Sequence, residues 1–343
     1  MSAILTTKQG LEMLSTGNIL ELGQAANAVR QELHPGNVVT FVIDRNINYT
    51  NICTSECRFC AFYRPVGHGE GYTLPEAVIF EKLRETIEAG GTQVMLQGGL
   101  NPDLGLDYYT NLLQSIKKNF DIVIHSFSPA EILHIAKGES LSIVETLMRL
   151  KAAGLDSLPG GGAEILVDAV RQRISPKKIS ANDWLTVMEA AHEVGLETTA
   201  TMVIGMGESY VQRMEHMEKV RKLQEKTGGF RAFIIWSYQP GNTEMGGEKI
   251  SAWDYLKTLS VARLYFNNIK HIQGSWVTQG QNIGQLTLAF GANDLGSIML
   301  EENVVRAAGT SYQMSIDKML ELIKATGKKP AQRDTQYNII KTF

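Results

Sequence analysis

The sequence predicts an α/β protein that folds as a closed, TIM-type (β/α)8 barrel. Eight short apolar runs have the composition of buried strands, and most are separated by segments whose apolar residues recur at helical spacing. Most of these runs end in glycine or polar residues, at the end of the strand where a barrel carries its chemistry. A doubly wound open sheet is the alternative, but the chain has no complete G-x-G-x-x-G motif.

The first part of the chain, residues 1–36, is predicted to be a helical cap. Apolar residues recur at helical spacing over 7–33, and Thr16-Gly17-Asn18 divides this stretch into two helices. Pro35-Gly36 then forms a turn. Residues 38–44 are rich in β-branched side chains and form the first predicted strand.

The barrel itself is predicted over residues 37–308. Its further strands are expected at 92–97, 122–127, 155–158, 198–204, 230–236, 271–277 and 286–290. Helices are expected at 76–89, 108–118, 142–153, 164–172, 182–194, 210–226 and 253–268, with one more opened by Ser128-Pro129. Helices near 301–308 and 314–325 end the chain, so residues 309–343 are expected to form a helical extension.

Composition argues against several classes of partner. The chain has 33 Lys and Arg against 36 Asp and Glu, a net charge of −3, which gives no electrostatic footprint for nucleic acid. No stretch reaches the roughly 18 apolar residues of a membrane span, and the first residues do not have the pattern of a secretory signal. Clustered, reduced cysteines fit the cytoplasm. We therefore expect a cytoplasmic protein without a nucleic-acid or membrane partner.

All three cysteines of the chain, Cys53, Cys57 and Cys60, lie in one short stretch with the spacing C-x3-C-x2-C. Iron–sulfur cubanes usually take four thiolates, so a [4Fe–4S] cluster bound here would keep one iron without a cysteine. The alternatives are buried apolar thiols, or a structural zinc ion with His68 as fourth ligand. A disulfide framework is disfavoured because the number is odd.

This cysteine motif, with the aromatic Phe59 before its last cysteine, resembles the signature of radical S-adenosylmethionine (SAM) enzymes. The resemblance implies a [4Fe–4S] cluster on Cys53, Cys57 and Cys60, with SAM chelated by the open iron. Reductive cleavage of SAM would give methionine and a 5′-deoxyadenosyl radical. The reducing electron would come from an external donor such as flavodoxin or ferredoxin.

Other motifs resemble the SAM-binding elements of the same superfamily. Gln97-Gly98-Gly99 is similar to the element that binds the methionine amino group, although alone it is a common strand-to-loop turn. The stretch 203–208, with Gly205, is similar to the element that supports adenine. Glu164 is a further candidate for the SAM site, but it could equally stabilise the first turn of a helix.

Two histidines are the better candidates for proton transfer. His125 ends a predicted strand, and His68 lies in a loop beside the cysteines. The remaining polar clusters at strand ends have no assigned role at this stage.

Longer stretches resemble the menaquinone and deazaflavin branch of the superfamily and, within it, the cyclic dehypoxanthinyl futalosine synthases of the futalosine route to menaquinone. These stretches are residues 48–53, 60–64, 69–72, 91–102, 125–129, 154–166, 227–230, 275–280 and 290–297. The resemblance implies that the deoxyadenosyl radical takes a ribose hydrogen from dehypoxanthine futalosine. The sugar radical then adds to the benzoate ring, and loss of an electron and a proton restores aromaticity.

Two other functions stay open from the sequence. One is the related aminofutalosine synthase, which adds the adenosyl radical to an enol ether instead of releasing deoxyadenosine. The other is a non-catalytic barrel stabilised by a structural metal.

Overall fold

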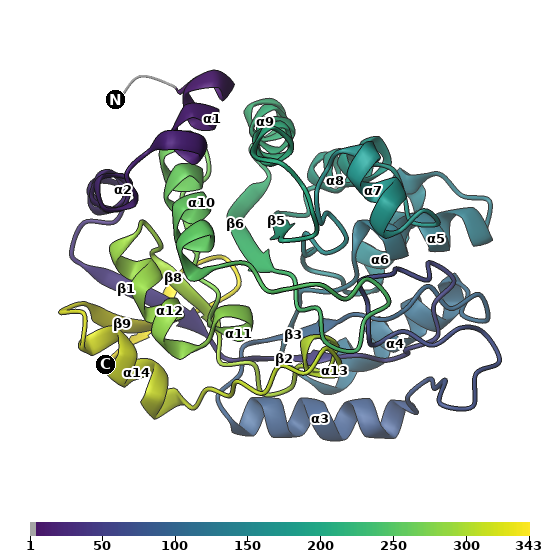
Figure 1. The fold of residues 1–343 in the computed structure, drawn as a ribbon. Coiled ribbons are helices and arrows are strands. Elements are labelled where there is room, and N and C mark those ends of the chain that lie inside the picture. Colours follow the sequence, from purple (N-terminus) through teal and green to yellow (C-terminus); the bar gives the residue numbers. More distant parts are fainter. Residues whose placement is uncertain (1–4) are drawn as a thin grey trace.

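The computed structural model describes residues 5–343, and the first four residues of the predicted helical cap lie outside this part. The cap itself is confirmed as two helices, α1 (Thr7–Thr16) and α2 (Ile19–Leu33). Thr6 and Gln9 form a capping box at the start of α1, and the Asn18 carboxamide accepts hydrogen bonds from two backbone N–H groups of α2. The pair packs on α9 (Tyr210–Thr227) and α10 (Ala252–Tyr265), beside the barrel (Figure 1).

The strands form two sheets that share one continuous run of chain. The larger sheet has the order β10-β9-β1-β8-β7-β6-β5 and the smaller β2-β3-β4. The two sheets are joined where β1 (Val38–Val42) of the larger sheet is followed by β2 (Asp44–Ile47) of the smaller one, with only Ile43 between them. The remaining strands are β3 (Gln93–Leu96), β4 (Val123–Ile124), β5 (Thr198–Ile204), β6 (Phe230–Ser237), β7 (His271–Gln273), β8 (Asp294–Ser297), β9 (Lys329–Arg333) and β10 (Ile339–Thr342).

Within each of the two sheets, parallel pairings link the barrel strands. β2 pairs with β3 and β3 with β4, while β5, β6, β7, β8 and β1 pair in sequence. The gap between β4 and β5 is spanned by two single bridges, His125 to Ser157 and Leu158 to Thr198. The predicted TIM-barrel type of α/β fold is therefore confirmed, but its strands form two sheets and not one closed sheet, and the fourth strand is too short to be more than a bridge.

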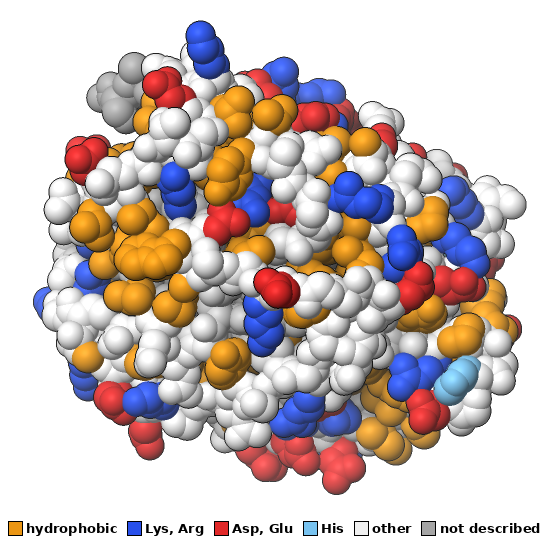
Figure 2. Space-filling view, viewed as in Figure 1, with side chains coloured by type: hydrophobic (Ala, Val, Ile, Leu, Met, Phe, Trp, Pro, Cys, Tyr) orange, Lys and Arg blue, Asp and Glu red, His pale blue; other side chains and the backbone are white. Residues whose placement is uncertain are grey.

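Helices surround the strands, as Figure 1 shows. Between the strands run α3 (Glu76–Glu88), α4 (Leu106–Asn119), α5 (Pro129–Gly138), α6 (Ile143–Ala153), α7 (Asp168–Ile174) and α8 (Ala181–Glu193), followed by α9 and α10. Short elements follow: α11 (Trp276–Gln279), α12 (Gln281–Leu286), the 3-10 turn η1 (Thr287–Ala289) and α13 (Val304–Ala307). None of the helices in residues 5–343 combines the length and apolarity that a transmembrane segment needs. Basic and acidic side chains are interspersed on the face shown in Figure 2.

The last barrel strand lies later in the chain than predicted. The expected strand 286–290 is helical in the structure, and the expected strand 271–277 stops at Gln273. The eighth strand is instead the polar segment Asp294–Ser297, which is buried throughout and pairs with β1 and β7. Its side chains have low strand propensity, but the ladder on both sides overrides that preference.

The predicted helical extension at residues 309–343 is only partly helical. After α14 (Ile316–Lys324) the chain forms β9 and β10. β9 runs parallel to β1, because β3 pairs with β2 but not with β1 and so leaves that edge of β1 open (Figure 1). The sequence Lys-Pro-Ala-Gln-Arg gave no strand signal because its partner, not its own composition, decides its conformation.

Candidate active site

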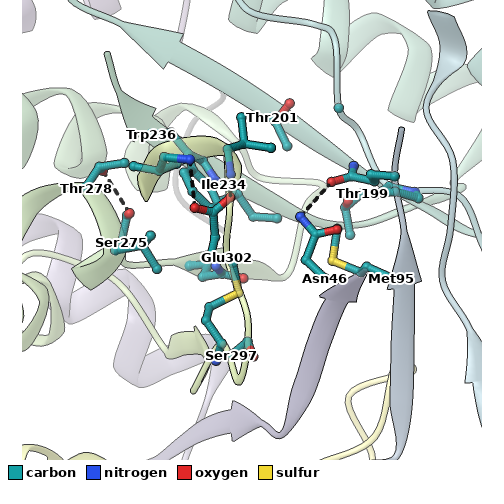
Figure 3. Close-up of a pocket in the computed structure, with 18 of the residues that line it drawn as sticks. Asn46, Met95, Thr199, Thr201, Ile234, Trp236, Ser275, Thr278, Ser297 and Glu302 are labelled. Atoms are coloured by element: carbon teal, nitrogen blue, oxygen red, sulfur yellow. Dashed lines mark hydrogen bonds between the residues drawn. The ribbon is translucent and has the colours of Figure 1, made fainter. Parts of the chain in front are cut away.

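A cavity of about 310 Å³ occupies the interior of the barrel. Alternate residues of neighbouring strands face it, as expected for a closed parallel sheet. Figure 3 shows lining residues from β2 and β3 (Asn46 and Met95), from β5 and β6 (Thr199, Thr201, Ile234 and Trp236), and from the later part of the chain (Ser275, Thr278, Ser297 and Glu302). Most of the lining is apolar, with polar groups from several strands, which is the usual character of a small-molecule site.

The cysteine loop follows β2 and forms part of the cavity wall. Phe59, Cys60 and Ala61 line the cavity, and Cys57 is buried behind them. Backbone hydrogen bonds fix the loop: the N–H of Cys53 donates to the carbonyl of Arg64 at 2.9 Å, and that of Arg58 to the carbonyl of Ile174 at 3.0 Å. All three cysteines are free thiols.

The glycine turn after β3 packs directly on the cysteine loop. A Cβ added to Gly99 would lie 2.1 Å from the carbonyl oxygen of Ile52 and 2.8 Å from the Cβ of Cys53. A Cβ on Gly98 would lie 2.5 Å from Cζ of Tyr49. Gly98 and Gly99 are therefore required for this close approach, whereas Gln97 is the member of the motif whose side chain lines the cavity.

Glu131, which the sequence did not single out, binds this glycine turn through a hydrogen bond. Its carboxylate accepts hydrogen bonds from the Tyr49 hydroxyl at 2.7 Å, the Gly98 N–H at 3.0 Å and the Ser128 hydroxyl at 2.6 Å. Burial raises the pKa of Glu131 to about 7, against the opposing effect of these hydrogen bonds. The Ser-x-x-Glu spacing at the start of α5 is the signal that could have identified it.

We expect the stability of the protein to fall between pH 4.5 and 7 through Glu131. The folded pKa of about 7 exceeds the ordinary glutamate pKa of 4.5, so the folded state retains a proton that the unfolded state releases. The contribution is fully present below pH 4.5 and is lost as the pH rises through 7, by up to about 3 kcal/mol. Urea unfolding of the metal-free protein across this range should show the decline, and Glu131→Gln should remove it. The exposed control Glu12→Gln should follow the wild type; a decline unchanged in Glu131→Gln would contradict the assignment.

Glu164 lies in the loop before α7, not in its first turn, because the helix begins at Asp168. The interpretation of Glu164 as a helix-dipole residue is therefore wrong. Its buried carboxylate is 2.9 Å from the ammonium of Lys178 and 3.5 Å from the guanidinium of Arg171. The Lys178 ammonium also lies 5.4 Å from the centre of the Phe59 ring. Glu164 thus connects the wall of the cavity to the cysteine loop through the partly buried ammonium of Lys178.

Gly205 ends β5 with φ of +98°, a conformation that favours glycine. Its N–H donates to the carboxylate of Glu208 at 2.9 Å, and Glu208 also accepts hydrogen bonds from Met206 and Arg213. The cavity wall includes Thr201 and Val203 of the same strand but not Gly205 itself. Glu208 therefore fixes the turn beyond the strand.

Comparison with known proteins places this arrangement in a family. Residues 47–220 match the family model of the radical SAM superfamily, and residues 227–342 match the CofH/MqnC C-terminal region. The chain belongs to the radical SAM superfamily. The predicted family membership is confirmed by the motif, by both models and by the relatives described next.

Two similar relatives are cyclic dehypoxanthine futalosine synthases. That of Halalkalibacterium halodurans is 50% identical over 99% of this chain and 92% of its own length. That of Streptomyces coelicolor is 44% identical over 97% and 85%. A third relative, the 5-amino-6-(D-ribitylamino)uracil–L-tyrosine 4-hydroxyphenyl transferase of Archaeoglobus fulgidus, is 40% identical over 94% of each chain.

Two solved structures support the radical SAM fold. Methylornithine synthase (PylB) has a TM-score of 0.75 at 20% identity, and the comparison covers 96% of this chain and 95% of that one. The hydrogenase maturase HydG from Carboxydothermus hydrogenoformans has a TM-score of 0.78 at 17% identity, over 97% and 77%. At these identities the likeness concerns the fold alone.

As a radical SAM protein, the chain uses a [4Fe–4S] cluster and SAM, and the chemistry of the cysteine loop fits the cluster. Burial raises the pKa of Cys57 to about 12 and also raises that of Cys60. Without metal these thiols hold their protons, and binding iron would release them. The positive charge of Lys178 acts against burial by lowering the pKa of both thiols, although burial has the larger effect. Lys178 therefore favours the thiolate forms that a cluster needs.

The cysteine arrangement gives no support to a mononuclear zinc site. Within residues 5–343, no three His, Cys, Asp or Glu side chains are grouped around the position of a single ion. A cluster does not require this convergence, because each thiolate binds a different iron. His68, the expected fourth zinc ligand, lies in an exposed turn, where its Nδ1 accepts the N–H of Glu70 at 3.1 Å.

The two histidines predicted for proton transfer lie in different environments. His125 is buried and lines the cavity, and its Nδ1 is 2.5 Å from the hydroxyl of Ser157. Burial lowers the pKa of His125 well below its usual range, so its imidazole is neutral near pH 7. His68 does not line the cavity.

Proposed function

We propose that this radical SAM protein catalyses the oxidative cyclisation of dehypoxanthine futalosine, a step of the futalosine route to menaquinone. The observation that carries the proposal is the 50% identity with the synthase of Halalkalibacterium halodurans over 99% of this chain. The Archaeoglobus fulgidus transferase is less similar, at 40%. A cavity lined mostly by apolar groups, with part of the cysteine loop in its wall, supports a small-molecule substrate held beside the cluster.

The residues of this chain would bind, orient and enclose the reactants. When bound, the cluster and SAM supply the 5′-deoxyadenosyl radical that starts the reaction. We propose Cys53, Cys57 and Cys60 as cluster ligands, and Phe59, Gln97–Gly99, Glu164 and Gly205 as the residues that hold SAM. The support is strongest for Phe59, Gln97 and Glu164, whose side chains share the cavity wall with Cys60. The enclosing barrel keeps water away from the reacting atoms.

His125 is the proposed acceptor of the proton that leaves when the ring regains aromaticity. Its neutral imidazole in the cavity wall supports this role, whereas the exposed position of His68 gives that residue no such support. In single-turnover assays, ring closure that proceeds unimpaired in His125→Gln would remove His125 from the role.

The partner and the compartment are also proposals. An external flavodoxin or ferredoxin would supply the reducing electron. The cytoplasm is the proposed compartment, because an oxygen-sensitive cluster and cysteines that form no disulfide fit a reducing environment. Electron transfer from reduced flavodoxin to the reconstituted protein, followed by SAM cleavage, would test the donor.

The function is tested by anaerobic reconstitution with iron and sulfide, followed by reduction with SAM and dehypoxanthine futalosine. We expect free 5′-deoxyadenosine and a product two hydrogens lighter than the substrate. Deoxyadenosine with unchanged substrate would point to another substrate, and adenosine retained in a product would point to radical addition, as in aminofutalosine synthase. A fully loaded protein that does not cleave SAM would contradict the assignment.

A further inference from the structure

The inner end of the cavity, far from the cysteine loop, has a polar lining. Arg231 is the second residue of β6, whereas the cavity-lining Trp236 and Ser237 end the same strand. Six strand residues span about 20 Å. Because the barrel strands are parallel, Arg231 lies at the end opposite the loops that follow the strands. Thr335 and Tyr337, which follow β9, line the cavity as well.

Of the two arginines that line the cavity, Arg333 already has an ionic partner. Its guanidinium binds the Asp294 carboxylate through two hydrogen bonds of 2.6 and 3.2 Å, and it lies 3.8 Å from the centre of the Tyr337 ring. Asp294 is fully buried, so this pair is internally compensated. Arg333 therefore has no unmatched charge to offer a ligand.

Arg231 is different, because its charge is poorly compensated. Its guanidinium donates to the Ser157 hydroxyl, but its Nε has no hydrogen-bond partner among residues 5–343. The one carboxylate within 4 Å in the described chain is Glu197, at 3.8 Å, and that side chain is 56% exposed while Arg231 is only 9% exposed. Desolvation lowers the pKa of Arg231. A cation in the cavity wall that is 9% exposed and poorly compensated is a binding group for an anion.

The neighbours of Arg231 define what kind of anion would fit. The Ser157 hydroxyl that accepts from Arg231 also contacts Nδ1 of His125, and within residues 5–343 the Nε2 of that neutral imidazole has no hydrogen-bond partner. Toward the cysteine loop the wall becomes apolar, with Met95, Ile234 and Trp236 (Figure 3). A carboxylate attached to a flat apolar ring would match this arrangement, with the carboxylate at Arg231 and the ring against the apolar wall.

We propose that Arg231 is the anchor for the benzoate carboxylate of the substrate, an inference that rests on the proposed function. The benzoate then lies at the inner end of the cavity, against the apolar wall. The ribose, from which hydrogen is removed, lies toward the cysteine loop. The same orientation brings the ring that must lose a proton close to His125, so one placement accounts for both groups.

The proposal is tested by binding to the reconstituted enzyme with SAM present and no reductant, so that nothing turns over. Isothermal titration compares dehypoxanthine futalosine with its uncharged benzamide counterpart. We expect the wild type to bind the acid about 10- to 100-fold more tightly than the amide. Arg231→Gln should bind both equally, and Arg231→Lys should retain part of the preference, because the charge stays but the fork geometry is lost.

Two control variants separate the anchor from indirect effects. Glu197→Gln removes the exposed partner of Arg231, and Arg149→Gln makes the same arginine change on the exposed face of α6. Both should keep the wild-type preference for the acid. The proposal would be overturned if Arg231→Gln kept the full wild-type preference for the acid over the amide. It would also be overturned if Glu197→Gln lost this preference while Arg231→Gln kept it.

The assay distinguishes failure of the anchor from failure of the proposed function. Cyclised product formed by a wild type with no preference for the acid would exclude the anchor and leave the function intact. A clear preference for the acid without turnover would support the anchor and contradict the function. If Arg231→Gln does not fold, as judged by circular dichroism, Arg231→Lys decides, and an undiminished preference in that variant would count against the anchor.

Discussion

Replacing Cys57 with alanine is expected to abolish SAM cleavage, which is among the largest effects that the structure predicts. Cys57 is the most buried of the three cysteines, with 7% exposure. A cluster that already lacks a fourth thiolate would retain only two protein ligands. Iron after reconstitution should drop from about four atoms per chain to well under one, and deoxyadenosine should fall to the level of the no-enzyme control.

The control for this experiment lies in the same loop. The hydroxyl of Ser55 is buried and has no hydrogen-bond partner within residues 5–343. Ser55→Ala should therefore cost little stability and leave iron content and SAM cleavage unchanged. A Cys57→Ala protein that retains a full cluster and cleaves SAM would show that another group completes the ligand set.

The alternation of strands and helices could be predicted from local pattern, but the strands that pair with β1 could not. Long amphipathic helices and strands such as β5, predicted at 198–204 and observed there, carry their own signals. β8 and β9 do not, because Asp294 and Arg333 are charged residues placed in strands only by their mutual ion pair and by the edges of β1. Such long-range pairing leaves no mark on a local sequence window.

The candidate site divides in the same way. Cys53, Cys57 and Cys60 could be proposed as cluster ligands from their spacing together with the resemblance of the motif to that of radical SAM enzymes. Arg231 could not be assigned a role, because its importance comes from burial without enough partners. The Ser-x-x-Glu spacing could have located Glu131, but it does not indicate that this carboxylate is buried against Tyr49 and Gly98. Burial is a property of the fold, so a sequence motif cannot report it.

Replacing Gly99 with alanine is expected to disable the protein although no cysteine is replaced. The new Cβ would fall 2.1 Å from the Ile52 carbonyl oxygen, a backbone atom that cannot turn aside as a side chain can. Relief requires the chain next to Cys53 to move. Overpacking of this kind costs about 1–3 kcal/mol, and a shift of about 1 Å in a reactive site can lower the rate on the order of 100-fold. We expect iron content and SAM cleavage to fall at least about 10-fold.

Gly69→Ala provides the matched control, because a Cβ at Gly69 would have no atom within 4 Å. Gly69 lies in the connection between β2 and α3 that also carries the cysteines. The control therefore adds the same methyl group at an open position of the cysteine-bearing connection. Gly69→Ala should reconstitute and cleave SAM as the wild type does, and circular dichroism should show that both variants keep their secondary structure. Full iron loading and wild-type SAM cleavage in Gly99→Ala would mean that the cysteine loop yields without displacing its ligands. The close contact of the glycine turn would then be a packing feature that the chemistry does not require.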